Sequence, residues 1–322
     1  MPRPVLALDI GGTKLTAGVI TPQGEVMADC VRPTEAGASP PEILETLLEM
    51  AEEALSQAPA EWNELAAIGI SFGGPVDFES GRTITCHHLA GWEGVPLRDL
   101  VAERAGLPVV MDNDANAAAL GETVFGAGKG CRHLLYLTVS TGIGAGLILD
   151  GGIYRGANSM AGEMGHMIVA PGGPVCTCGR RGCLEAVAAG PAIVRAAREA
   201  LAHEAGSILA AVPRGELTAR HVAEAAASDA LAARIMTQVG EYLGTGIACA
   251  VNLINPEVVV VGGGVSRAGD LLLAPAREVV ADRAVAESSR HLRIVAGELE
   301  PRGALLGAAA LALAESDPAE SP

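Results

Sequence analysis

The chain has 322 residues, roughly two domains at ~150 residues each, and its 22 Lys and Arg against 38 Asp and Glu give a formal charge of −16. That charge argues against a nucleic-acid-binding protein, which needs a basic face to neutralise phosphates. Hydrophobic residues make up 49% of the chain and charged residues 19%, a composition that excludes disorder and predicts a sizeable core.

The N-terminus and the cysteines predict the compartment. Apolar residues begin at Val5 with no signal peptide before them, and the Ala-rich run over residues 304–314 is too short to cross a bilayer. We therefore expect a cytoplasmic protein with no membrane partner. Three of the seven cysteines fall within residues 176–183, which indicates metal or redox chemistry rather than a disulfide framework.

The first half of the chain alternates strands and helices. Residues 5–20 read as a hairpin with a glycine-rich turn, and Ser39 followed by two prolines marks a helix start. The expected elements that follow are a helix over 40–55, a strand over 66–71, a helix over 97–105 and a strand over 109–111 that ends in the polar residues 112–114. This alternation predicts an α/β domain.

The second half restarts the same pattern. An apolar strand over 134–139, a glycine-rich turn over 140–146 and a returning strand over 147–149 resemble the first hairpin, offset by about 130 residues. We therefore expect an internal duplication. A long helix over about 231–252 and a strand over 258–261 that leads into three glycines follow.

The two glycine-and-hydroxyl turns are suited to phosphate, because their backbone N–H groups and small side chains can close around a polyanion. An ordinary tight β-turn is the alternative for residues 9–14 taken alone. A dinucleotide-binding fingerprint at the third glycine cluster is disfavoured, because Arg267 stands where the next glycine is expected.

One imidazole and three thiols form a candidate metal centre. His166, Cys176, Cys178 and Cys183 are a Cys₃His set of the kind that encloses structural Zn²⁺. Three reduced thiols beside a surface histidine are one alternative. A redox pair is another, although C-x-C lacks the thioredoxin-like spacing. We expect the other cysteines to be packing residues: Cys30, Cys86, Cys131 and Cys249.

Four segments in order, over residues 9–14, 113–116, 163–166 and 176–185, resemble the ROK family of bacterial repressors, open reading frames and sugar kinases. The resemblance covers nearly the whole chain. It implies the α/β fold of the actin-like ATPase superfamily, with two RNase-H-like lobes and an interlobe cleft that binds ATP and sugar. The expected lobes are residues 1–117, completed by the C-terminal helix 304–322, and residues 118–303, which include the zinc loop 163–185.

Asp114 is the expected catalytic residue. A carboxylate within reach of an attacking hydroxyl can accept its proton, and the resemblance implies that Asp114 is the general base on a sugar 6-hydroxyl. The alternative is a strand-end Asp that caps a helix beginning near Ala115. Asp112 has no such match and is interpreted as structural.

The resemblance also implies a nucleotide site with Mg²⁺. Asp9 would orient the ion, generally through water, while the two glycine turns would contact phosphate and the third glycine cluster would pack against the adenosine. The expected nucleotide-site residues are Asp9, Gly11, Gly12, Thr13, Lys14, Thr141, Gly142, Gly144, Gly263 and Gly264.

The zinc loop would fix the sugar site, because Glu163 and Glu185 stand close to metal ligands in sequence. The resemblance implies sugar contacts by Gly74, Asn113, Asp114, Glu163, His166 and Glu185. The chain departs from the family at His87 and His88, which stand where many members have Asn. This departure leaves the identity of the sugar open.

We expect an ATP-dependent hexose kinase acting on glucose or a close relative. N-acetylmannosamine, N-acetylglucosamine, mannose and fructose are alternative substrates. A sugar-responsive repressor is disfavoured, because the kinase strand starts at about Val5 and leaves no room for a DNA-binding segment. A non-catalytic sugar-binding regulatory protein is the alternative class of function.

Polyphosphate is a less favoured phosphate donor than ATP, because no cluster of basic residues extends beyond Lys14. The resemblance implies a homo-oligomer, a dimer or tetramer.

Overall fold

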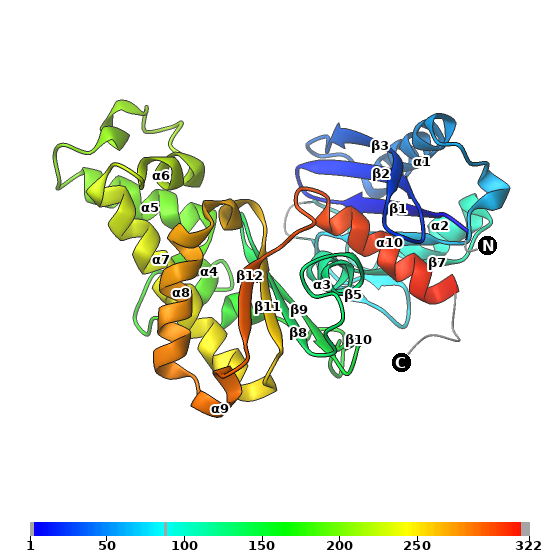
Figure 1. Cartoon of the computed structure of the whole chain (residues 1–322). Helices are drawn as coiled ribbons and strands as arrows, with labels where there is room; N and C mark the ends of the chain where they lie inside the picture. The colour runs from blue at the N-terminus through cyan, green and yellow to red at the C-terminus, as the bar shows by residue number, and fades with distance from the viewer. Residues whose placement is uncertain (1–2, 87–88, 317–322) are drawn as a thin grey trace. The chain divides into compact units, whose positions relative to one another are not determined.

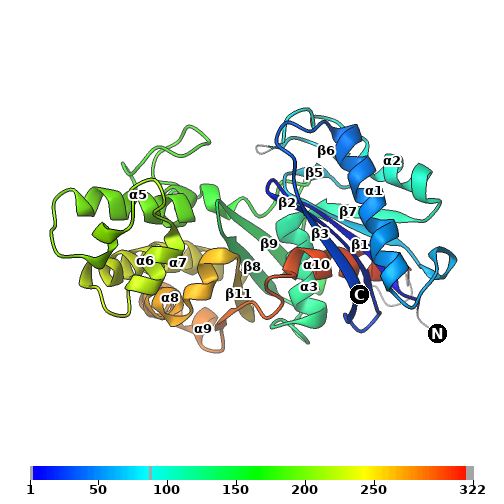
Figure 2. The same ribbon diagram turned by 90° about the horizontal axis from the view of Figure 1, so that it is seen from above.

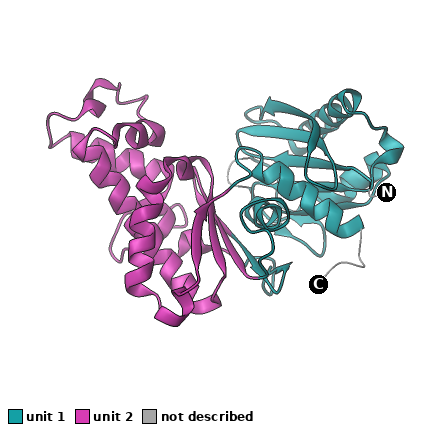
Figure 3. Ribbon diagram, in the orientation of Figure 1, with its two compact units in different colours: residues 1–132, 146–161, 298–322 teal, residues 133–145, 162–297 magenta. Residues whose placement is uncertain are grey.

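The computed structural model describes residues 3–86 and 89–316, which form two compact units (Figures 1 and 3). Unit 1 takes its residues from 1–132, 146–161 and 298–322, and unit 2 from 133–145 and 162–297. This division differs from the expected lobes. The expected boundary at 117/118 falls inside the continuous helix α3 (Asp114–Phe125), which belongs wholly to unit 1.

Unit 1 is built on a five-stranded sheet with the order β3-β2-β1-β4-β7. β1 pairs antiparallel with β2 and parallel with β4, and β4 pairs parallel with β7. The strands are β1 (Val5–Ile10), β2 (Lys14–Ile20), β3 (Val26–Pro33), β4 (Ile68–Phe72) and β7 (Val109–Asn113), and β5 (Val76–Asp77) pairs separately with β6 (Arg82–Thr83). The hairpin expected over residues 5–20 is therefore present.

Helices cover both faces of this sheet. Figure 2 shows α1 (Pro40–Gln57) and α2 (Leu97–Ala105) on one side of the strands, and α3 and α10 (Gly303–Ser316) on the other. Side chains alternate between the faces along a strand. Leu6 and Leu8 thus pack with α1, whereas Val5 and Ala7 pack with α10. With both faces covered, β1 is buried along its whole length.

The helix that begins at Asp114 is held tightly against α10. A Cβ on Gly307 of α10 would overlap the carbonyl group of Ala117, and a Cβ on Gly121 would lie 2.9 Å from the nitrogen of Gly307. These two glycines let the helix backbones approach more closely than any side chain would allow. The position of α3 in unit 1 is therefore set by backbone packing.

The second five-stranded sheet has the order β10-β9-β8-β11-β12, with β11 parallel to both β8 and β12. Its strands are β8 (Leu134–Val139), β9 (Ile143–Leu149), β10 (Gly152–Ile153), β11 (Val258–Gly262) and β12 (Arg293–Ala296). When the five strands of each sheet are numbered in chain order, both sheets have the order 3-2-1-4-5. β5 and β6 form a separate two-stranded sheet and are not counted. The internal duplication predicted from the sequence is thus visible in the topology.

Helices pack together in unit 2. The longest, α7, runs over Ala230–Ile254 and ends where Asn255 adopts a left-handed conformation before Pro256. A Cβ on Gly244 of α7 would lie 2.6 Å from the carbonyl oxygen of Ala276 in α8, so these helices also approach closely. The helices are α4 (Leu184–Ala188), α5 (Gly190–Leu201), α6 (Ala219–Ala225), α7, α8 (Asp270–Arg283) and α9 (Ala286–Ser289).

Short 3-10 helices connect the main elements. They are η1 (Trp62–Glu64), η2 (Met164–His166), η3 (Ile208–Ala211) and η4 (Gly264–Ala268). Within residues 3–86 and 89–316, every helix is too short or too polar to traverse a lipid bilayer.

Candidate active site

A buried polar row lies at the carboxyl ends of three neighbouring parallel strands in unit 1. Asp9 of β1, Ser71 of β4 and Asp112 of β7 are register partners, and each is at most 6% exposed. The Ser71 hydroxyl donates a hydrogen bond of 2.9 Å to Asp9 Oδ1. In parallel sheets this edge is where ligands bind.

Asp9 is a buried acid of this row with a raised pKa. Its pKa is raised from 3.8 to about 6, chiefly by burial. The Ser71 hydrogen bond and the Lys14 charge oppose this rise, and the negative charge of Asp114 adds to it. A cation beside Asp9 would offset the cost of burying its charge. Carboxylate oxygen is a ligand type that Mg²⁺ accepts, so the residues present fit the ion that the resemblance implies.

The turn after Asp9 presents its side chains outward. Gly11 N–H donates to the Lys14 carbonyl at 3.0 Å, and the Thr34 hydroxyl donates to the Gly11 carbonyl at 2.7 Å. Thr13 and Lys14 are exposed, whereas Gly11 and Gly12 are half-buried. The turn is thus anchored through its backbone, which leaves the hydroxyl and the ammonium group available to a ligand.

A pocket of about 620 Å³ opens beside this turn, wholly within unit 1. Its lining residues include Asp9, Lys14, Thr16 and Arg302. The Thr16 hydroxyl is buried and has no hydrogen-bond partner among the residues described. Because a buried unsatisfied hydroxyl is costly, a polar ligand or water that reached it would be stabilised there.

Asn113 and Asp114 occupy the junction between β7 and α3. Asn113 caps the helix through its Oδ1, which accepts from Ala115 N–H at 3.0 Å, and its Nδ2 donates to the Gly74 carbonyl at 3.0 Å. A Cβ on Gly74 would lie 2.5 Å from the Thr85 carbonyl oxygen, so only glycine fits there. The structure therefore brings Asn113 and Gly74 together.

Asp114 is half-buried and is the first residue of α3. Its Oδ1 also accepts from Ala115 N–H, at 2.8 Å. The helix thus starts one residue earlier than expected, and Asn113 supplies the cap that is the alternative role for Asp114. The contribution of the Asp114 charge to the pKa of Asp9 places these two carboxylates in the same electrostatic environment.

In unit 2, the predicted metal ligands converge. The candidate ligand atoms of His166, Cys176, Cys178 and Cys183 all lie within 4.8 Å of one another. Cys178 Sγ and Cys183 Sγ are 3.6 Å apart, and Cys176 Sγ is 3.6 Å from His166 Nδ1. A tetrahedral zinc with Zn–S bonds of about 2.3 Å separates its sulfurs by about 3.8 Å. The four side chains therefore fit a closed zinc site.

The pKa values of two of these thiols shift in opposite directions. A hydrogen bond from the Arg180 backbone lowers the pKa of Cys178 to about 7, whereas burial raises the pKa of Cys183 to about 12. Among the remaining cysteines, only Cys86 is fully buried, and Cys249 is exposed. The interpretation of Cys249 as a packing residue is therefore wrong.

Of the three candidate sugar-binding residues of unit 2, His166 belongs to this cluster, and Glu163 and Glu185 lie beside it. His166 Nδ1 faces Cys176, while its Nε2 is 3.8 Å from Glu163 Oε2. Glu185 Oε1 accepts from the Thr177 hydroxyl at 3.1 Å, and its Oε2 accepts from Ile143 N–H at 3.2 Å. The two imidazole nitrogens thus point in different directions, so one can bind metal while the other faces a ligand.

The turn between β8 and β9 is closed by a hydrogen bond from Ser140 N–H to the Gly142 carbonyl at 2.9 Å. A Cβ on Gly142 would lie 2.7 Å from Glu185 Oε2, so this glycine also makes room for the carboxylate. Thr141 is exposed, and Gly144 is half-buried within β9. The structure thus connects the second glycine turn with Glu185.

Gly263 follows β11 directly and caps η4, and Gly264 is the first residue of η4. Gly263 has a φ of +83°, and a Cβ there would lie 2.5 Å from the Val139 carbonyl oxygen, whereas the nearest atom to a Cβ on Gly264 would be 4.0 Å away. Gly263 is therefore required by the fold, and Gly264 leaves open space. The predicted residues His87 and His88 lie outside the described part of the chain.

The ROK family model matches residues 5–315. The chain belongs to the ROK family. The glucokinase of Thermotoga maritima is 36% identical over 315 residues, covering 95% of this chain and 96% of that protein. The putative xylose repressor of Caldicellulosiruptor sp. is 35% identical, over 97% of this chain and 78% of the repressor.

A solved structure shares the fold. A ROK family glucokinase from Streptomyces griseus, in complex with glucose and AMPPNP, superposes with a TM-score of 0.82 and 33% identity over 95% of this chain and 98% of that one. The predicted α/β fold of the actin-like ATPase class is confirmed for this ROK protein.

Proposed function

We propose that this ROK protein is an ATP-dependent hexose kinase that phosphorylates the 6-hydroxyl of glucose or a close relative, with Asp114 as general base. The observation that carries the proposal is the position of Asp114. Its half-buried carboxylate begins α3 at the carboxyl edge of the sheet, directly after Asn113, which is tied to Gly74. The similarity to glucokinases along the whole chain supports the same reaction.

In the proposed step, Asp114 accepts the proton of the sugar hydroxyl while the hydroxyl oxygen bonds to the γ-phosphorus. The bond between that phosphorus and the β,γ-bridging oxygen breaks, and ADP leaves. The first turn of a helix favours an ionised carboxylate, which is the form that accepts a proton. Catalysis of phosphoryl transfer rests mainly on positioning and charge, so fixing Asn113 and Asp114 at one junction is part of the chemistry.

Nucleotide binding is assigned to the glycine turns and the nearby pocket. Lys14 and Thr13 are exposed on an anchored turn, and a volume of about 620 Å³ suits a small ligand. Asp9 would hold Mg²⁺, which when bound neutralises phosphate charge. The remaining nucleotide contacts proposed are Gly11, Gly12, Thr141, Gly142, Gly144, Gly263 and Gly264.

The sugar-binding residues proposed are Gly74, Asn113, Asp114, Glu163, His166 and Glu185. The Cys₃His cluster would hold a structural Zn²⁺ and thereby stiffen the segments that carry the last three. Rigid carboxylates can distinguish hydroxyl patterns, because a mismatched hydroxyl leaves a buried acceptor unpaired.

The relationship to a putative xylose repressor makes a sugar-binding regulatory protein the alternative. The deciding experiment measures ADP release with MgATP and a panel of sugars: glucose, mannose, fructose, N-acetylglucosamine and N-acetylmannosamine. Sugar-dependent ADP release supports a kinase and identifies the sugar. Binding of a sugar without ADP release supports the regulator and refutes the kinase.

A further inference from the structure

A second buried carboxylate lies two residues before the proposed base, paired with an arginine from another part of unit 1. Arg155 Nε donates to Asp112 Oδ2 at 2.7 Å. The Asp112 side chain is 2% exposed and that of Arg155 25%. Because burying a charged group is costly unless it is paired and hydrogen-bonded, Arg155 stabilises the Asp112 side chain at this buried position.

The other oxygen of Asp112 is committed to the catalytic junction. Oδ1 accepts from Asn113 N–H at 2.8 Å and from Asn116 Nδ2 at 2.9 Å. These two donors flank Asp114 in sequence, one at the end of β7 and one in the first turn of α3. The carboxylate therefore bridges the two elements between which Asp114 is held.

Arg155 itself has a rigid support. Its guanidinium carbon lies 3.5 Å from the centre of the Phe78 ring, a stacked cation–π contact. Phe78 N–H donates to the Ser159 hydroxyl at 3.3 Å, which ties the phenylalanine to the segment that carries Arg155. The guanidinium is thus held between an aromatic face and a carboxylate.

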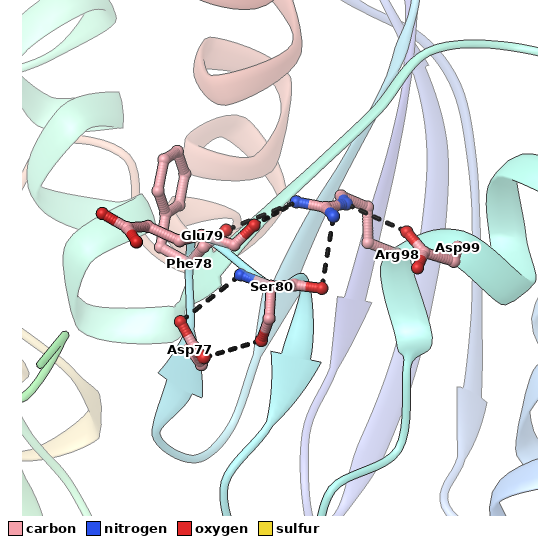
Figure 4. A network of polar contacts seen from close by, with 6 residues as sticks. All are labelled: Asp77, Phe78, Glu79, Ser80, Arg98 and Asp99. Atoms are coloured by element: carbon pink, nitrogen blue, oxygen red, sulfur yellow. Dashed lines mark hydrogen bonds and ion pairs between the residues drawn. The ribbon is translucent and has the colours of Figure 1, made fainter.

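The loop that carries Phe78 is braced in turn by Arg98 (Figure 4). Arg98 donates to the carbonyl groups of Phe78, Glu79 and Ser80 at 3.4, 3.1 and 3.2 Å, and the Ser80 hydroxyl donates to Asp77 Oδ2 at 2.7 Å. A continuous series of contacts therefore runs from α2, which carries Arg98, to the junction that carries Asp114.

We propose that Arg155 is a positioning residue for the phosphoryl transfer: by holding Asp112, it fixes the β7–α3 junction and so the orientation of the Asp114 carboxylate. The inference rests on the proposed function and adds a residue to it. Arg155 acts through Asp112 and Asn113 rather than on the substrate. A displacement of about 1 Å at a reacting group costs on the order of a hundredfold in rate, so a loosened junction is expected to lower turnover.

The first test is kinetic. Arg155→Met keeps the length of the apolar stem but removes the charge and the Nε–H, and it should lower kcat about 10- to 100-fold while sugar KM stays within about threefold of wild type. Arg155→Lys keeps the charge and should recover part of the loss. The matched control is Arg104→Met, which breaks an exposed ion pair with Glu45 on the same unit and should leave kcat unchanged.

A variant that unfolds would also lose activity. A comparison of Arg155→Met with a double variant therefore separates an effect on stability from an effect on the orientation of Asp114. Arg155→Met leaves the buried Asp112 charge unpaired, whereas Asp112→Asn combined with Arg155→Met removes both charges. Thermal unfolding should show that the double variant regains stability over Arg155→Met. Its kcat should stay as low as that of the single variant, because the junction is still not fixed.

Amide hydrogen exchange provides a readout independent of activity. Peptides that cover residues 109–120 should exchange faster in Arg155→Met than in Arg104→Met, with the other strands of unit 1 unchanged. Unchanged exchange in these peptides, or a kcat within twofold of wild type in Arg155→Met, would overturn the positioning role. If the wild-type protein turned over no sugar, the kinase proposal would fail, and the exchange result alone would decide the role of Arg155 at the junction.

Discussion

The carboxylate of Glu185 accepts a hydrogen bond of 3.2 Å from the backbone N–H of Ile143, the first residue after the β8–β9 turn. Its other oxygen accepts from Thr177, which lies between two of the clustered cysteines. One side chain thus bridges a proposed phosphate turn and the proposed zinc loop within unit 2. The orientation of Glu185 toward a sugar therefore depends on both.

The first prediction concerns Gly142. Alanine at this position would place a Cβ 2.7 Å from Glu185 Oε2 and push the carboxylate aside. Because the side chain can move, stability should change little, but sugar KM should rise roughly tenfold, the value of one charged hydrogen bond. Steady-state kinetics and a thermal melt measure the two effects separately.

Gly215→Ala is the control for this variant. Gly215 is also in unit 2, and a Cβ there meets nothing within 4 Å, so its kinetics and melting temperature should match wild type. Unchanged sugar KM in Gly142→Ala would show that Glu185 does not contact the sugar through this geometry.

The second prediction concerns the metal. Purified protein should contain about one zinc per chain, and Cys178→Ala should lose it, because three ligands no longer enclose the ion. Since metal-binding free energy becomes folding free energy, each kcal/mol of zinc-binding free energy that is lost should lower the melting temperature by roughly 2–4 °C. Metal analysis by mass spectrometry and calorimetry measure both.

Cys249→Ser tests whether any cysteine loss has this effect. Cys249 is exposed, so its variant should retain zinc and stability. Wild-type protein without zinc would refute the assignment of the four ligands.

The third prediction concerns pH and Glu122 of α3. Its buried carboxylate accepts from Ala127, Glu298 and Leu299 N–H groups at 2.9, 3.3 and 3.1 Å, yet burial outweighs these bonds and raises its pKa above 4.5. The folded state therefore binds the proton more tightly than the unfolded state. This contribution to stability is complete below pH 4.5 and is lost as pH rises through the folded-state pKa.

Glu122→Gln cannot titrate, so its unfolding free energy should lack this loss. The free energy of unfolding of both proteins can be measured by denaturant unfolding from pH 4 to pH 8. As the pH rises, wild type should lose stability relative to Glu122→Gln. Glu52→Gln, at an exposed position on α1, is the control and should show no such shift. A pH-independent difference for Glu122→Gln would contradict the raised pKa.

The fourth prediction concerns Asp9. Asp9→Asn removes the carboxylate proposed to hold Mg²⁺, so the Mg²⁺ concentration for half-maximal turnover should rise about 10- to 100-fold. Asp99→Asn, an exposed residue of α2 in the same unit, should leave the Mg²⁺ dependence unchanged. An unchanged Mg²⁺ dependence in Asp9→Asn would remove Asp9 from the metal site.

Local patterns in the sequence predicted the elements and the turns of this fold. The apolar runs at residues 5–10 and 134–139 are strands, and the repeated strand–turn–strand pattern corresponds to two sheets of the same strand order. The Cys₃His cluster was also predictable, because its spacing carries the chemistry. These features depend on residues close together in the chain.

Contacts set by long-range register could not be predicted. Ser71 reaches Asp9 only because β1 and β4 pair in parallel with these two residues opposite each other. Arg155 reaches Asp112 because β7 ends beside a segment 43 residues later. Nothing in a single strand's pattern fixes such pairings. The expected boundary at 117/118 differs from the division into units for a similar reason, since α3 packs on α10 through Gly307.

The most direct test of the account compares sugar turnover and sugar binding in wild type and Asp114→Asn. The account predicts that kcat for the preferred hexose falls about 10²- to 10⁴-fold, as for loss of a general base, while the calorimetric dissociation constant of that hexose stays within about tenfold, the value of one hydrogen bond to a charged group. A kcat within threefold of wild type in Asp114→Asn would contradict it.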